Sequence, residues 1–132
     1  MNGRFITGDD IVRESFDWGE SGWVSRPEFT GSRALCVMDV KLNPGGGHPF
    51  HKHPDQEEVI WVREGRVEQW LEDSKQELGP GEAVYIPKGV VHASYTIGDE
   101  PAKLSVILSP TAGEGGYEEI DVFEEEPWPS LR

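Results

Sequence analysis

Turn-forming residues interrupt this chain so often that only short extended segments can form between them. The 132 residues include 16 glycines and 10 prolines. Turn signals lie at residues 44–47, 64–65, 73–74, 79–81 and 98–101. The segments between and beside them predict strands at 34–42, 58–63, 66–72, 75–78, 83–87, 90–97 and 102–108. Many short strands of this kind, without helical periodicity, are typical of an all-β barrel or jelly roll.

Three of the four histidines are concentrated beside these turns. His51 and His53 are two residues apart, so in an extended chain both point to one face, with roughly 6.5–7 Å between their Cα atoms. Two imidazoles at that separation can converge on a single metal ion about 2.1 Å from each nitrogen. His92 follows a proline–lysine–glycine turn and shares its strand face with the small polar side chains two and four residues later. This pattern indicates the lining of a cavity.

An adjacent pair of glutamates offers a carboxylate ligand. Glu58 is in phase with Ile60 and Val62, whereas Glu57 is in phase with Trp61 and its outward neighbours. Strand alternation therefore favours Glu58 as the inward residue, with Glu57 as the alternative. A mixed set of imidazole and carboxylate ligands suits one divalent transition metal ion: Fe, Mn, Ni, Cu or Zn.

The two segments resemble the two motifs of the cupin superfamily. The first motif, G-x5-H-x-H-x3-4-E-x6-G, is matched by Gly45, His51, His53, Glu58 and Gly65. The second, G-x5-P-x-G-x2-H-x3-N, is matched by Gly81, Pro87, Gly89 and His92, and Thr96 stands where the family has asparagine.

The resemblance implies a fold and a ligand set. The fold is an antiparallel double-stranded β-helix, or jelly-roll barrel, in which residues 1–132 form one cupin domain with a barrel core at about 33–109. The implied metal ligands are His51, His53, Glu58 and His92. His48, in the glycine-rich segment before His51, is expected in a loop at the entrance of the site.

The net charge, and the lack of a targeting or membrane-spanning segment in this sequence, limit the partners and location that we expect. The net charge of −13 disfavours binding to nucleic acid. The N-terminus lacks an apolar signal segment, and no run of residues is long enough to span a membrane, so we expect a cytoplasmic protein. The single cysteine, Cys36, is in phase with apolar neighbours and is expected to pack in the core. Trp18, Trp23 and Trp128 lie outside the predicted barrel strands, where they either cover the barrel mouth or, as we favour, seal a homodimer. The acidic segment 114–126 is expected to pack its apolar side on the barrel.

The expected barrel lining suggests the kind of substrate. It is mostly apolar, with Met38, Val40, Ile60, Val62, Val84, Ile86, Leu104 and Val106, and its polar exceptions are Gln69, Ser94 and Thr96. A lining without a fixed cation suits a small, weakly charged, aromatic or enolisable organic molecule. Resemblance to quercetin-dioxygenase-like cupins implies an oxygenase-type enzyme in which Glu58 also serves as general base. The alternatives are a non-redox isomerase, lyase or decarboxylase, and a metal-bound sensor without turnover.

Overall fold

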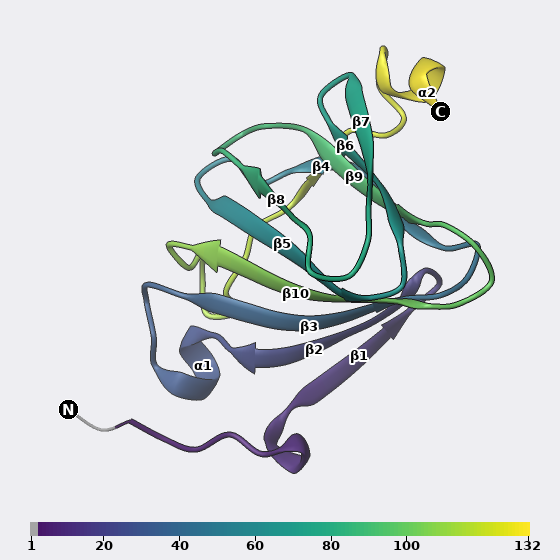
Figure 1. The fold of residues 1–132 in the computed structure, drawn as a ribbon. Helices are drawn as coiled ribbons and strands as arrows, with labels where there is room; N and C mark the ends of the chain where they lie inside the picture. Colours follow the sequence, from purple (N-terminus) through teal and green to yellow (C-terminus); the bar gives the residue numbers. More distant parts are fainter. Residues whose placement is uncertain (1–2) are drawn as a thin grey trace.

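Two antiparallel sheets make up nearly the whole molecule, which a computed structural model describes from residue 3 to residue 132 (Figure 1). The larger sheet has the order β1 (Val12–Phe16), β2 (Gly19–Ser25), β3 (Cys36–Leu42), β10 (Ala102–Ser109), β5 (Glu57–Glu64) and β8 (Ala83–Ile86). The smaller sheet has the order β11 (Ile120–Asp121), β4 (Gly47–Lys52), β9 (His92–Thr96), β6 (Val67–Leu71) and β7 (Ser74–Leu78). The all-β prediction is confirmed.

Helix is limited to single turns near the termini and after β2. These are the 3-10 turn η1 (Gly8–Asp10) and the helices α1 (Pro27–Thr30) and α2 (Trp128–Leu131). Within the described chain, none of these helices is long or apolar enough to cross a membrane.

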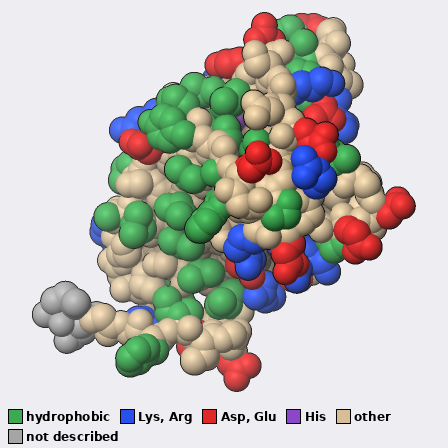
Figure 2. All heavy atoms as spheres, in the orientation of Figure 1, with side chains coloured by type: hydrophobic (Ala, Val, Ile, Leu, Met, Phe, Trp, Pro, Cys, Tyr) green, Lys and Arg blue, Asp and Glu red, His purple; other side chains and the backbone are tan. Residues whose placement is uncertain are grey.

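The terminal segments behave differently from each other. The N-terminal segment extends away from the sheets (Figures 1 and 2), and Phe5 is 96% exposed. The C-terminal segment returns to the smaller sheet, where the ring of Trp128 lies 5.3 Å from that of Phe50 and Arg132 covers the ring of Tyr95 at 3.5 Å. The C-terminal segment is therefore anchored on the smaller sheet by an aromatic contact and a cation–π contact.

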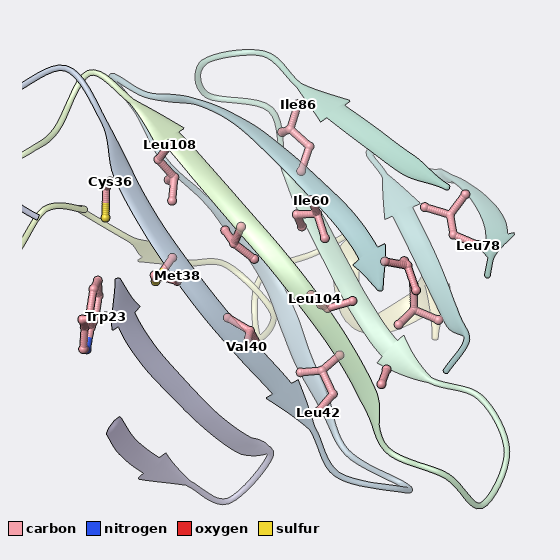
Figure 3. Packing of buried hydrophobic residues seen from close by; sticks show 14 residues of the cluster. Trp23, Cys36, Met38, Val40, Leu42, Ile60, Leu78, Ile86, Leu104 and Leu108 are labelled. Carbon is pink, nitrogen blue, oxygen red and sulfur yellow. The ribbon is translucent and has the colours of Figure 1, made fainter. Parts of the chain in front are cut away.

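The core fills the space between the two sheets because strand alternation turns every second side chain inward. Along β10, buried and half-buried residues alternate through all eight positions. Leu104 lies beside Val40 in the register of β10 with β3, and both point into the interior (Figure 3). Cys36 is fully buried in this cluster, beside Trp23.

Four strands lack the usual sequence signals of a strand. The seven predicted strands all have counterparts within two residues at each end, but β1, β2, β4 and β11 were not predicted. β4 begins with glycine, histidine and proline, residues with little strand propensity, and it forms because it pairs with β9 and β11. The expectation that His48 lies in a loop is wrong, since His48 is the second residue of β4.

Candidate metal centre

Three imidazoles and one carboxylate meet inside the barrel. His51 lies in β4, His53 follows the end of β4, His92 begins β9, and Glu58 lies in β5. All four side chains are buried, with exposed fractions between 0% and 5%. Ligand nitrogens of the three histidines lie within 4.8 Å of one another. The structure thus brings together all four residues of the predicted ligand set, called here the histidine–glutamate cluster.

Hydrogen bonds to backbone carbonyls fix the orientation of each imidazole. The Nδ1 atoms of His51, His53 and His92 lie 2.7, 2.8 and 2.9 Å from the carbonyl oxygens of Pro49, Glu118 and Val90. A carbonyl oxygen only accepts, so each Nδ1 must carry the proton and donate it. Each Nε2 then has a free lone pair, which is the state that binds a metal ion.

Glu58 and its neighbour His92 each have a buried polar atom without a hydrogen-bond partner among the described residues. Glu58 Oε1 lies 2.9 Å from His92 Nε2 and 3.4 Å from His53 Nε2. Neither Glu58 Oε1 nor His92 Nε2 makes an aligned hydrogen bond with any described residue. Buried polar atoms in this condition are costly, and a cation between them would satisfy both. The donor set therefore fits a divalent metal ion.

Electrostatics within the cluster favour the same conclusion. Burial lowers the pKa of His51 well below its usual value, with the nearby His48 and His92 adding to the effect, and burial also lowers the pKa of His53. Burial opposes charge on His92 and Glu58 too, but their mutual attraction outweighs it, raising the pKa of His92 and lowering that of Glu58. A cation would replace the proton that Glu58 otherwise favours on His92.

The two adjacent glutamates lie on opposite sides of β5. Glu58 is buried, while Glu57 is exposed and accepts a hydrogen bond of 3.3 Å from the hydroxyl of Tyr85. The alternation argument placed these two side chains as the structure has them.

A second group of candidate ligands adjoins the cluster but shares one of its members. His48 stacks on His51 with 3.8 Å between ring centroids, and its Nε2 lies 3.1 Å from Glu119 Oε1. Since His51 Nδ1 is committed to the Pro49 carbonyl, His51 has one nitrogen to offer, and it can serve one ion. That nitrogen belongs to the site formed by His51, His53 and His92, which are all buried, whereas His48 and Glu119 are half-buried.

Sequence reasoning missed Glu119, whose carboxylate faces the cavity. Burial raises its pKa, but the hydrogen bond and charge of His48 outweigh this and hold it at about 2. Its neighbour Asp121 has a pKa raised to about 6, first by hydrogen bonding to Glu119. No signal in the sequence could have found Glu119, because it reaches the site across an irregular segment of unknown register.

Gln56 was missed as well, although it lies inside the first motif. Its side-chain amide is 2% exposed and makes three hydrogen bonds: Nε2 donates to the carbonyls of Pro110 and Gly116, and Oε1 accepts from the N–H of Glu118. The carbonyl of Glu118 in turn holds the imidazole of His53. Gln56 thus ties residues 110–118, called here the strap, over the histidine–glutamate cluster.

A cavity that opens to solvent leads to the cluster. Met38, Val40, Ile60, Leu104 and Val106 line it as expected, and no lysine or arginine of residues 3–132 does. The expectation that Gln69 and Val84 line the same space is wrong, because both face a separate cavity between β6, β7 and β8. Val62 and Ile86 are packed in the core.

This combination of a two-sheet barrel and an inward histidine–glutamate cluster defines a known class of protein. The family model described as "Cupin domain" matches residues 38–108, more than half of the chain. The chain belongs to the cupin family.

Relatives within the family cover nearly the whole chain. "Protein SchB" of Streptomyces halstedii is 28% identical over 92% of this chain and 88% of its own length. "Polyketide synthase CurC" of Streptomyces cyaneus is 32% identical over 92% of this chain and 79% of its own length. By contrast, "Germin-like protein 3-8" of Oryza sativa subsp. japonica is 37% identical over 58% of this chain, and the match covers only 37% of its own length.

Solved structures agree on the fold. The polyketide cyclase RemF from Streptomyces resistomycificus superposes with a TM-score of 0.76 at 23% identity, covering 96% of this chain and 91% of its own. KdgF from Halomonas sp. superposes with a TM-score of 0.71 at 23% identity, covering 83% and 96%.

Proposed function

We propose that this cupin is a metal-dependent enzyme that removes a proton next to a carbonyl group of a small, largely apolar, enolisable substrate. The observation that carries the proposal is the course of the cavity, which is apolar along its walls and ends at the histidine–glutamate cluster. A cavity without lysine or arginine among the described lining residues disfavours phosphorylated or dicarboxylate substrates, which need a fixed cation.

His51, His53, His92 and Glu58 would hold the metal ion. When bound, a divalent ion would supply Lewis-acid polarisation of a substrate carbonyl. The chain's own contribution begins with orientation, since three backbone carbonyls fix the imidazoles before any ligand enters. Once released from the metal, Glu58 would supply the carboxylate that accepts the proton, and its lowered pKa keeps it ionised near neutral pH. The apolar walls exclude water from the reacting atoms.

We favour a non-redox reaction over the oxygenase that the sequence suggested. CurC and RemF, which match almost the full chain, are named as a polyketide synthase and a polyketide cyclase. Polyketide intermediates are rich in enolisable carbonyls. The oxygenase-type reaction remains the second candidate, because the same ligand set is compatible with a metal that binds oxygen.

Hydrogen–deuterium exchange tests the proposal directly. 1-Phenyl-1,3-butanedione carries an acidic CH₂ between two carbonyls, and its exchange in D₂O can be followed by NMR under strict anaerobiosis. Metal-loaded protein should accelerate exchange over metal-free protein, and Glu58→Gln should abolish the acceleration when compared at equal bound metal. Equal exchange with and without metal would sink the proposal. Substrate-dependent oxygen uptake, measured in parallel with an electrode, would establish the oxygenase instead.

We further propose that the protein works as a homodimer. Figure 2 shows hydrophobic side chains gathered on one face of the molecule. Trp61 on β5 and Tyr85 on β8 are 50% and 55% exposed on the outer side of the larger sheet. Exposed aromatic residues on neighbouring strands are typical of a protein interface. Light scattering after size exclusion should give about twice the chain mass, and Trp61→Glu should convert the protein to monomer. A monomeric wild type would refute this proposal.

A further inference from the structure

We infer that the cavity binds a planar, fused-ring ligand with oxygen atoms at both ends, one at the histidine–glutamate cluster and the other at Ser21. The inference rests on the proposed function and adds the shape of the substrate and a residue that selects it. Three observations carry it: a continuous stack of rings, an unpaired buried hydroxyl, and the spacing between that hydroxyl and the cluster.

The rings of Phe16, Trp18, His48 and His51 form a stack, called here the aromatic ladder. It runs from the cavity mouth to His51, one of the residues proposed to hold the metal ion. Phe16 and Trp18 lie 4.9 Å apart at 6°, Trp18 and His48 lie 5.3 Å apart at 14°, and His48 and His51 lie 3.8 Å apart at 19°. Exposure falls along it from Phe16, which is 40% exposed, to His51, which is 3% exposed. All four rings line the cavity.

The stacking within the ladder determines which part of each ring can contact a bound small molecule. Trp18 and His48 each have a ring on both faces, so what they present to the cavity is their edges. Ring edges carry partial positive charge and prefer the negative face of another aromatic system. Met38 lines the same cavity and adds a thioether, which also packs well against aromatic rings. A flat aromatic ligand that turns its face to the ladder meets both preferences.

Ser21 provides a polar contact far from the cluster. It lies on β2, is 4% exposed and lines the cavity, yet its hydroxyl has no hydrogen-bond partner among residues 3–132. By contrast, the buried Ser94 donates a hydrogen bond of 2.6 Å to Gln69. A buried hydroxyl without a partner is unfavourable, so its presence points to a ligand that completes it.

Strand register gives the length of the ligand. Ser21 pairs with Val40, which pairs with Leu104, whereas Glu58 pairs with Leu108. The two rows are four residues apart along β10, or roughly 13 Å, and because β3 and β10 also separate β2 from β5 across the sheet, this is a lower bound on the distance between the Cα atoms of Ser21 and Glu58. The side chains at each end shorten the gap, so a single benzene ring is too short to touch both, and two or three fused rings are needed.

A matched pair of ligands tests the inference. 2,6-Dihydroxyanthraquinone has a hydroxyl at each end, and 2-hydroxyanthraquinone lacks one of them. With Zn(II)-loaded protein in calorimetry, Ser21→Ala should weaken the first ligand about three- to tenfold, as expected for one lost hydrogen bond, and change the second less than twofold. Ser105→Ala, at a half-exposed position on β10, is the control and should change neither.

The aromatic ladder is tested by a second pair of variants. Trp18→Leu should weaken both ligands about three- to tenfold, whereas Phe5→Leu, on the exposed N-terminal segment, should leave both unchanged. Thermal melts of the metal-free variants check folding, and Ser21→Ala should melt no lower than wild type because it removes an unpaired hydroxyl.

The inference would be overturned if Ser21→Ala bound the two ligands with the wild-type ratio. It would equally be overturned if 4-hydroxyacetophenone, with one ring, bound wild type as tightly as the dihydroxy tricycle. Because binding is measured without turnover, these results are separate from the proton-exchange assay. Failure of exchange with the affinity differences intact would count against the proposed reaction and support the ligand.

Discussion

Replacing Gln56 by leucine should both destabilise the protein and loosen a candidate metal ligand. The side chain is 2% exposed, and leucine is close to it in size, so the main change is the loss of the amide. The carbonyl of Pro110 and the N–H of Glu118 then lose their partners, while the carbonyl of Gly116 keeps only its bond from the N–H of Ala112. A stranded polar group costs about 1–3 kcal/mol, and the strap is partly accessible to water, so we expect about 3 kcal/mol in the free energy of unfolding.

The second effect follows from the link between the strap and His53. The carbonyl of Glu118 holds His53 Nδ1 at 2.8 Å, and Gln56 holds the N–H of the same residue. Once that tether is gone, His53 is no longer held in the orientation that directs Nε2 inward. Loss of such a supporting contact typically lowers metal affinity about 10–100-fold.

Two measurements separate these effects. Urea denaturation of the metal-free protein gives the change in stability, and competition with a chelator of known affinity gives the change in Zn(II) affinity. Gln76→Leu, at an exposed position of β7, is the matched control and should change neither. If Gln56→Leu lost stability but kept Zn(II) affinity within twofold, the strap would not position His53, and the argument would be refuted.

Three further predictions concern single positions. His53→Ala should lower Zn(II) affinity by more than 100-fold, whereas His48→Ala should change it only a few-fold, and equal affinities in a chelator competition would show that the ligand set is misassigned. Glu58→Gln should reduce the metal content of purified protein sharply while the exposed Glu57→Gln keeps it, as mass spectrometry of bound metals can decide; the reverse outcome would invert the two roles. Burial raises the pKa of the Cys36 thiol from 9.0 to about 11, so iodoacetamide should leave it unmodified at pH 8 in the folded protein and alkylate it in urea. The same shift should make the free energy of unfolding fall as pH rises from about 9 towards 11, because the unfolded thiol ionises first, and fast alkylation of the native protein would contradict this description of the core.

How much of the site could be read from the sequence depended on how local each determinant is. His51 and His53 are two residues apart and Glu58 follows closely, so strand alternation and motif spacing were enough to place their side chains. The same local rule separated Glu58 from Glu57. The seven predicted strands were visible because turn residues bound them and most contain β-branched or aromatic residues.

Other features exist only through contacts between distant segments. β4 is a strand because β9 and β11 pair with it, although its own residues have little strand propensity. Gln56 is linked to the site through the strap, which lies more than 50 residues later in the chain, and Glu119 directly follows the strap. No side-chain periodicity extends across such a loop. Ser21 had no mark in the sequence either, since its unpaired hydroxyl acquires meaning from the cavity around it. Local spacing along the chain encodes the barrel and the set of candidate metal ligands, so both could be predicted from the sequence. Tertiary structure alone decided what surrounds that cluster, because those neighbours are set by which strands pair.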